Sequence, residues 1–438
     1  MTANAAVQPA LLSFTVALAD EAPGDPLDLV GHDGVLFDGP GLTLVGWGSA
    51  ARAQLPGGLL DPAGREALSA LLDGIAVHDE VDRPGTGPLA LGALPFDRGA
   101  PGTLCVPRVL LGRSDGQSWL TVVGPDATRP TAQEADKMIR ARRSEAGGPD
   151  ALVSVSIPCL EHRPGPNDYA RAVARAVAEI HAGKLRKVVL ARCVDVTPVR
   201  VGSPVALLRR LRSPEPSTTS FLVPVDGEHF VGASPELIVA RRGSTVWCHP
   251  LAGTTSLTGR PEAPSASDRL LGSPKELEEH RLVVDAVAAA LRPRCDSLSV
   301  PDQPEVLRLA TDARLSTRVE GRLAEGLPLP AVLELLADLH PTPAVGGVPR
   351  DEALRLIADA EPEPRGFWAG PVGWTDRSGN GDWVLGIRSV TMRTGYARVW
   401  AGAGIVSGSD PEAELAETTL KLRPVIDALA QDAGPGAV

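Results

Sequence analysis

Three charged side chains near the C-terminal end of the sequence have the spacing to share one face of a helix. Residues 401–421 read AGAGIVSGSDPEAELAETTLK, where a glycine-rich run precedes a Ser/Asp/Pro helix start. Glu414, Glu417 and Lys421 follow, and spacings of three and seven residues put them on one helical face. Two carboxylates and an ammonium group beside a flexible loop suit a divalent metal ion and an anionic ligand. We therefore predict an acid-rich small-molecule site here.

A second predicted helix contributes another carboxylate, Glu279. It begins at residues 273–276 (SPKE), which have the form of a capping box with proline at the first helical position. Mg²⁺ prefers a few carboxylates together with water and substrate oxygens, so Glu279 adds weight to a metal site with Glu414 and Glu417. Alternatively, Glu414 and Glu417 are acids in a first helical turn, which the helix dipole stabilises without any ligand. Glu276 can be a solvated surface acid.

Three further charged residues lie in or beside apolar strands. Lys187 opens KVVLAR and is either a surface lysine or a buried base, whose pKa desolvation would lower. Glu236 follows the turn sequence GASP and is either solvent-exposed or a positioned acid. Arg388, inside VLGIRSV, needs a carboxylate partner, which either a ligand or the protein supplies. The sequence pattern leaves these alternatives open.

The glycines of residues 401–408 do not have the spacing of a dinucleotide-binding loop. Gly402, Gly404 and Gly408 form GxGxxxG rather than GxGxxG, and no strand-ending acid follows about 20 residues on. We interpret Gly402 instead as a point where backbone N–H groups approach a substrate carboxylate. Residues 340–347 (HPTPAVGG) form a rigid loop with small residues that leave space, or simply end a helix.

Strands and helices mix along the chain without regular alternation, which predicts an α+β fold with large, mostly antiparallel sheets. Short apolar runs separated by Gly/Pro turns predict strands and hairpins in the first 130 residues. A helix is predicted over 131–145, and the residues AGGP at 146–149 make the best candidate boundary. The later predicted strands include 187–196, 236–242, 245–253 and 314–323, followed by three more before the C-terminal helix.

The composition is that of a globular protein and argues against several functional classes. Of 438 residues, 43% are hydrophobic and 22% are charged, and the net charge is -11. No basic stripe alternates with aromatic residues, and no apolar run reaches about 18 residues, so we expect neither nucleic-acid binding nor a membrane span. The five cysteines are scattered without a CxxC pair, and no basic segment begins the sequence. We therefore expect reduced thiols and a cytoplasmic location.

Eight motifs occur in an order that resembles one enzyme family. They are KVVLAR, GASPE, HPLAGT, the EH of Glu279 and His280, LHPTPAVGG, GIR, AGAGIV and ExxExxxK, and they span roughly residues 160–430. This set resembles the chorismate-utilising enzymes, in particular the isochorismate synthases. The resemblance implies one compact α+β unit with two large, mostly antiparallel sheets and helices on the outside. In it, residues 1–150 would be a variable part that completes the fold, and 160–432 the chorismate-binding catalytic region.

The resemblance also implies roles for individual residues. Lys187 matches the general base that activates water for attack at C2 of chorismate, and Glu236 matches the acid that protonates the departing C4 hydroxyl. Mg²⁺ would be held directly by Glu279 and Glu417, with Glu414 acting through water. The implied substrate-binding positions are Gly253, Thr254, His340, Ala344, Ile387, Arg388, Gly402 and Lys421. By the same resemblance we expect a monomer that acts on chorismate.

Two positions separate this chain from relatives with other products. Anthranilate-type enzymes usually have glutamine where Lys187 stands, and aminodeoxychorismate-type enzymes have lysine where Ala252 stands. Water is therefore the expected nucleophile. Two alternatives stay open, a salicylate synthase that eliminates pyruvate from isochorismate and a non-catalytic chorismate-binding homologue. The sequence also leaves open whether the product enters siderophore or menaquinone biosynthesis.

Overall fold

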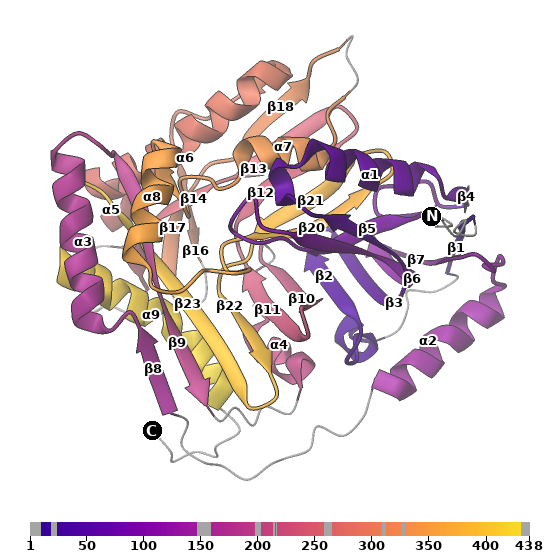
Figure 1. The fold of residues 1–438 in the computed structure, drawn as a ribbon. Coiled ribbons are helices and arrows are strands. Elements are labelled where there is room, and N and C mark those ends of the chain that lie inside the picture. Colours follow the sequence, from indigo (N-terminus) through magenta and orange to yellow (C-terminus); the bar gives the residue numbers. More distant parts are fainter. Residues whose placement is uncertain are drawn as a thin grey trace, which may run out of the picture.

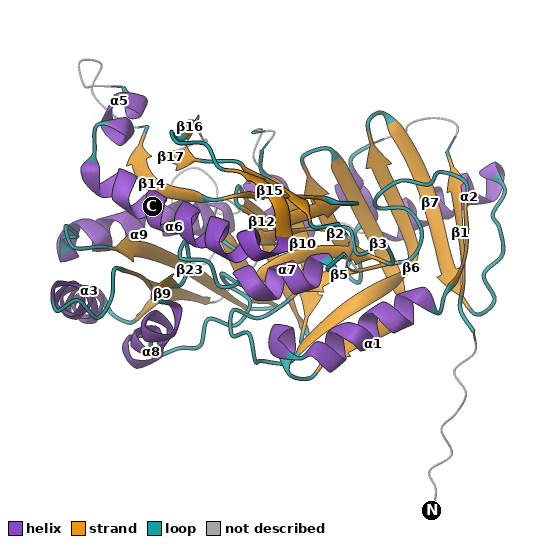
Figure 2. Cartoon of the chain, turned by 90° about the horizontal axis from the view of Figure 1, so that it is seen from above, coloured by secondary structure: helices purple, strands orange, loops and turns teal. Residues whose placement is uncertain are grey.

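More residues lie in strands, nearly all of them antiparallel, than in helices, and the helices lie on the outside of the sheets (Figure 1, Figure 2). The computed structural model describes residues 10–18, 24–146, 159–197, 203–212, 215, 217–257, 265–308, 312–325 and 329–430. The boundary predicted at 146–149 lies outside these residues except for Ala146. Within the described ranges, no helix is long and apolar enough to cross a membrane.

The first sheet, called the large sheet here, runs from β8 at one edge to β4 at the other. Its neighbouring strands are antiparallel except β1 and β4, which are parallel. A short strand, β19 (Gly347–Val348), also pairs with the start of β9. In spatial order, the strands are β8 (Cys159–Arg163), β9 (Lys187–Thr197), β23 (Tyr396–Ile405), β22 (Ser389–Arg393), β11 (Glu228–Ser234), β10 (Thr219–Val225), β2 (Val35–Gly39), β3 (Leu42–Leu55), β6 (Gly102–Ser114), β7 (Gln117–Gly124), β1 (Leu12–Ala17) and β4 (Ala76–Asp79).

A second sheet joins the large sheet through the pair Leu91–Cys105, between β5 and β6. Its strands are all antiparallel, in the order β5 (Leu89–Ala93), β20 (Pro371–Asp376), β21 (Gly381–Leu385), β12 (Leu237–Arg242), β13 (Thr245–His249), β18 (Val319–Leu323) and β15 (Cys295–Ser299). A separate small sheet contains β14 (Leu251–Ser256), β17 (Asp312–Ser316) and β16 (Glu305–Arg308). This architecture confirms the predicted α+β class.

The helices begin where the sequence carries start signals. Ser273 caps α6 by accepting a hydrogen bond from the Glu276 N–H, and Pro274 occupies the first turn, as predicted. The helices are α1 (Pro62–Asp73), α2 (Ala132–Ala146), α3 (Pro166–His181), α4 (Pro204–Leu211), α5 (Ala266–Leu271), α6 (Pro274–Leu291), α7 (Val332–Leu339), α8 (Arg350–Ala360) and α9 (Pro411–Ala430), and the short 3-10 turns are η1 (Pro26–Leu29), η2 (Gly58–Leu60) and η3 (Arg292–Arg294).

Two segments predicted as single strands are each divided between two sheets. The segment 245–253 breaks at Pro250 into β13 of the second sheet and β14 of the small sheet. The segment 314–323 breaks at Thr317 and Arg318 into β17 and β18, which follow the same division. Both single-strand predictions were therefore wrong. The breaks matter because they turn β14 and β17 toward the pocket described below.

The central pair β9 and β23 positions the candidate site. The two strands run antiparallel, with Val188 opposite Ile405 and Ala191 opposite Gly402. Their inward side chains belong to an apolar core that also contains residues of α7 and α8. Helix α9 follows β23 and packs against it, while α6 packs against β14. Residues far apart in the sequence are thus fixed around one opening (Figure 1).

Candidate active site

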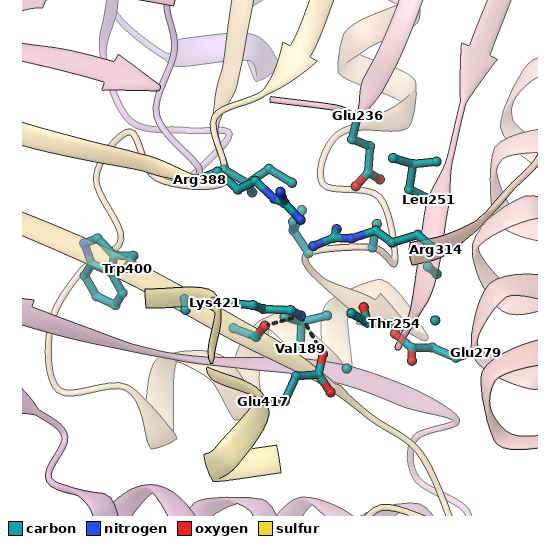
Figure 3. Close-up of a pocket in the computed structure, with 18 of the residues that line it drawn as sticks. Val189, Glu236, Leu251, Thr254, Glu279, Arg314, Arg388, Trp400, Glu417 and Lys421 are labelled. Atoms are coloured by element: carbon teal, nitrogen blue, oxygen red, sulfur yellow. Dashed lines mark hydrogen bonds and ion pairs between the residues drawn. The ribbon is translucent and has the colours of Figure 1, made fainter. Parts of the chain in front are cut away.

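A pocket lies among the small sheet, β23, α9 and the turn before β22, and it contains most of the predicted site residues (Figure 3). Residues from ten separate segments of the sequence contribute side chains or backbone to its wall. Ten of the thirteen predicted residues line it, namely Glu236, Gly253, Thr254, Glu279, Ala344, Ile387, Arg388, Gly402, Glu417 and Lys421.

One end of the pocket contains Glu236, which lies in the short connection between β11 and β12. Its side chain is almost fully buried, with 4% of the residue exposed. Burial raises the pKa of Glu236 to about 7, although the positive charges of Arg314, Lys187 and Lys421 act in the opposite direction. A carboxyl group with a pKa near neutrality can hold a proton and deliver it to a leaving group. This favours the acid interpretation of Glu236 over the exposed one.

Lys187 contacts the pocket through Glu279 and is not part of the lining itself. The lysine is fully buried, and its Nζ lies 3.0 Å from Oε1 of Glu279, which does line the pocket. Gly404 permits this approach, because a Cβ atom at that position would overlap the Glu279 carboxylate. The surface interpretation of Lys187 is therefore wrong, and a buried amine stands beside a carboxylate at the pocket wall.

The first turns of α9 present the three charged residues on one side, as their spacing predicts. Glu417 and Lys421 form an ion pair at 2.6 Å, and Lys421 Nζ also donates to the carbonyl oxygen of Gly402 at 3.0 Å (Figure 3). Glu414 is 1% exposed and pairs with Lys275 of α6 at 2.8 Å. Glu414 therefore lies outside the lining, and it links the two helices that carry the predicted metal ligands.

Carboxylates from α6 and α9 repel one another around this region. Burial and the charge of Glu279 raise the pKa of Glu276 to about 7, and burial and the charge of Glu417 raise that of Glu414. One buried oxygen of Glu414, Oε2, has no hydrogen-bond partner. Carboxylate oxygens whose negative charge is not balanced by nearby cations or hydrogen-bond donors are suitable ligands for a divalent cation. In the conformation of the described residues, however, no three such side chains converge closely enough to hold a metal, so Mg²⁺ binding stays a prediction.

Arg388 lines the pocket and has a protein carboxylate as its partner. Its Nη2 lies 2.7 Å from each oxygen of Asp312, the first residue of β17. The backbone of Arg388 has a φ of +50°, a left-handed conformation that is uncommon for such a residue. Asp312 also accepts a hydrogen bond of 3.2 Å from Nε of Arg314, which lines the pocket as well. The two arginines hold the pKa of Asp312 at about 2, against the effect of burial.

The structure does not bring His340 into the pocket. The residue is fully buried, with Nε2 at 3.0 Å from the carbonyl oxygen of Phe96 and its ring packed edge-on against the Phe96 ring. Burial lowers the pKa of His340 to about 3, so the ring is neutral and Nε2 can donate to that carbonyl. Its contacts instead hold the start of the loop that places Ala344 in the lining.

Several residues of the site had no signal in the sequence. Arg314 is a single arginine in a strand, and the stacked indole rings of Trp368 and Trp400 come from separate segments, with ring centroids 5.7 Å apart. Glu276 is not a solvated acid, because its Oε2 accepts a hydrogen bond of 2.8 Å from the Thr254 N–H. That bond lies beside Gly253, whose φ of +71° bends β14 toward the pocket.

The chain is similar to several known proteins. A family model described as "chorismate binding enzyme" matches residues 37–430. Isochorismate synthase DhbC of Bacillus subtilis is 41% identical over 277 residues, which cover 61% of this chain and 69% of that protein. Isochorismate synthase EntC of Escherichia coli is 35% identical over 346 residues, covering 78% of this chain and 81% of that protein.

A solved structure extends the similarity to nearly the whole chain. The menaquinone-specific isochorismate synthase MenF of Escherichia coli superposes with a TM-score of 0.74 at 25% sequence identity. The superposition covers 97% of this chain and 95% of that one.

Proposed function

Because this chain belongs to the chorismate-binding enzymes, we propose that it is an isochorismate synthase, which converts chorismate to isochorismate. The observation that carries the proposal is the pair of proton-transfer groups at one pocket. Glu236, with a pKa near 7, lines it, and Lys187 reaches it through Glu279. Water addition at one ring carbon and loss of hydroxyl from another need such a base and acid.

The reaction can be written with these residues and balances in atoms and charge. Lys187, when neutral, takes a proton from a water molecule whose oxygen bonds to C2. The ring double bonds shift toward C4, and the C4–oxygen bond breaks. Glu236 gives its proton to the departing hydroxyl, which leaves as water. Hydroxide is a poor leaving group without this proton, so the raised pKa of Glu236 serves the step directly.

The substrate is a dianion, and the site supplies positive charge although the chain has a net charge of -11. Arg388 and Lys421 line the pocket, and we propose that they bind the carboxylates of the substrate. We propose that Glu279 and Glu417 bind Mg²⁺, with Glu414 acting through water. The ion would neutralise negative charge of both the substrate and these acids.

Product identification tests the proposal. The purified protein is incubated with chorismate and Mg²⁺, and the products are followed by NMR together with an enzymatic assay for pyruvate. We expect isochorismate without pyruvate, and no turnover after Mg²⁺ is removed with EDTA. Salicylate with equimolar pyruvate would replace the proposal with a salicylate synthase. Binding of chorismate without turnover would replace it with a non-catalytic homologue.

A further inference from the structure

A pocket with three arginines lies apart from the candidate active site. It has a volume of about 470 Å³ and lies beside η3, between α6 and α7, which pack against each other (Figure 2). The segment after β5 and the first residue of α8 complete its wall. It shares no lining residue with the candidate active site, and its charged residues are Arg98, Arg294, Arg350 and Asp338.

Only one of the three guanidinium charges is balanced by a carboxylate in this pocket. Nε and Nη2 of Arg294 lie 3.0 and 2.9 Å from Oδ2 of Asp338. Arg350 instead donates through Nη2 to the backbone carbonyl oxygens of Asp338, at 2.8 Å, and Leu339, at 3.2 Å. These carbonyl groups carry no net charge, so they hold the Arg350 side chain in place and leave its charge unbalanced.

Arg98 also has no counter-ion. Its buried Nε lacks a hydrogen-bond partner, and no carboxylate in the described part of the chain forms an ion pair with it. Burial and the charge of Arg98 lower the pKa of Arg350, so the two guanidinium groups lie near each other. Asp351 acts in the opposite direction, but its side chain is exposed and its charge is screened by solvent.

This arrangement favours the binding of an anion. Three positive charges against one negative charge leave a surplus of two, in a chain whose net charge is -11. Like charges that lie together repel, and a buried donor without an acceptor adds to the cost. An anion that contacts both guanidinium groups removes both penalties.

The size of the surplus indicates which kind of anion the pocket takes. Guanidinium groups bind phosphate oxygens through paired N–H donors, and a phosphate monoester carries nearly two negative charges at neutral pH. A single carboxylate would neutralise only half of the surplus. The rest of the wall is apolar and can contact the organic part of such a ligand; it consists of Ala289, Ala290, Pro293 and Ala337.

We propose that Arg98 and Arg350 form a binding site for a phosphate monoester, outside the candidate active site. The phosphoryl group binds both guanidinium groups, and the organic group lies against the apolar residues of α6, η3 and α7. The inference does not depend on the proposed function, because no residue of the candidate active site enters it.

The ligand would connect two segments that are already linked inside the protein. Phe96, two residues before Arg98, has its carbonyl oxygen at 3.0 Å from Nε2 of His340. Arg350 follows the loop that places Ala344 in the candidate active site. A phosphoryl group bound by Arg98 and Arg350 therefore joins these segments a second time, and it should raise the melting temperature of the protein.

Calorimetry with simple probes tests the site. Inorganic phosphate, phenyl phosphate and benzoate are titrated into the purified full-length protein at constant ionic strength. We expect phenyl phosphate to bind with a Kd below about 1 mM. Benzoate, which has the same ring but one negative charge, should bind at least about tenfold more weakly. Arg98→Gln should weaken the binding of both phosphates at least about tenfold, the usual effect of losing a charged hydrogen bond.

Melting temperatures separate a binding role of Arg98 from a structural one. Because Arg98 has no partner to lose, Arg98→Gln should melt at or above the wild-type temperature without phosphate. Addition of 10 mM phosphate should stabilise the wild type and not this variant. Arg140→Gln is the matched control, since Arg140 is an exposed arginine of α2 whose loss changes the net charge equally. It should respond to phosphate as the wild type does.

A second variant blocks the pocket without removing an arginine. Ala289 is exposed on α6, so Ala289→Glu introduces a carboxylate at the wall with a residue that is favourable in helices. It should abolish phosphate binding, and it decides the matter if Arg98→Gln does not fold. The proposal is overturned if neither phosphate binds the wild type at 10 mM, if benzoate binds as tightly as phenyl phosphate, or if the variants bind phosphate within twofold of the wild-type Kd.

Discussion

Burial decides the chemistry of Glu236. The sequence placed a carboxylate after a turn and left its role open, whereas the fold encloses it and raises its pKa to about 7. The cations that face it, Arg314, Lys187 and Lys421, keep that value from rising further. A pKa of about 7 leaves part of the molecules with a protonated Glu236 at neutral pH, as the proposed acid requires.

The pH dependence of turnover should report this residue. Glu236 donates only when protonated, and a carboxyl with a raised pKa stays protonated below that pKa and loses the proton above it. We therefore expect kcat to fall as the pH rises through about 7 and beyond. Stopped-assay kcat values between pH 6 and 9 check this, and a kcat that is flat across the range would contradict it.

Glu236→Gln provides the control for that profile. The amide keeps the shape of the side chain but has no proton to give, so kcat should fall by about 10²–10⁴. The residual kcat of this variant should no longer fall as the pH rises through about 7. A variant with normal turnover would remove Glu236 from the mechanism.

At the residue scale, the sequence could predict positions that occur in distinctive motifs and not those fixed by tertiary pairing. Glu236 and Lys421 belong to recognisable motifs, and both line the pocket. Arg314 reaches it only because β17 pairs with β14 in a register where Arg314 faces Thr254. His340 occurs in a motif too, but its partner is Phe96, which is 244 residues away and could not be anticipated.

At the scale of elements, the approach of α6 to β23 depends on a glycine. A Cβ at position 404 would overlap the carboxylate of Glu279 and touch the Lys187 side chain, whereas one at position 408 would meet nothing within 4 Å. Sequence reasoning favoured Gly402 for close backbone approach. In the structure, a Cβ at Gly402 meets Trp368 and the neighbouring strand, so Gly402 too is tightly packed.

A pair of glycine substitutions tests this contact. Gly404→Ala should displace Glu279 and lower kcat, or the affinity for Mg²⁺, at least tenfold, because the ion pair with Lys187 is broken. Gly408→Ala should leave both within twofold. The measurement is kcat as a function of Mg²⁺ concentration for the two variants. Equal behaviour of the two variants would show that the close packing at position 404 has no functional consequence.

Local signals predicted the helices better than the strands. Helix α6 begins at the predicted cap, and α9 carries its charges on one side, because caps and spacings act within a few residues. The division of the strands at Pro250 and at 317–318 depends on which sheet each half joins. That choice is made by contacts distant in sequence, which an apolar run does not encode.

At the scale of the whole molecule, buried polar groups couple stability to pH. His340 is enclosed by the core, and burial lowers its pKa to about 3. The unfolded chain, with an ordinary histidine pKa near 6.5, binds a proton that the folded chain excludes. The contribution of His340 to stability is therefore complete above pH 6.5 and is lost as the pH falls toward 3.

Melting experiments can isolate this effect. The melting temperature should drop between pH 7 and pH 5, and His340→Asn, though less stable at pH 7, should show a smaller drop. His78→Gln is the control, because His78 is exposed on β4. A drop of equal size in the wild type and in His340→Asn would show that other groups control acid stability.

The oxygen atom that enters the product provides the most direct test of the central claim, that water adds at C2 while the C4 hydroxyl leaves. The enzyme is incubated with chorismate and Mg²⁺ in H₂¹⁸O, and the product is examined by mass spectrometry and by the isotope shift of its ¹³C resonances. We predict isochorismate with one ¹⁸O atom, located in the C2 hydroxyl. Isochorismate that keeps the original hydroxyl oxygen would contradict the account.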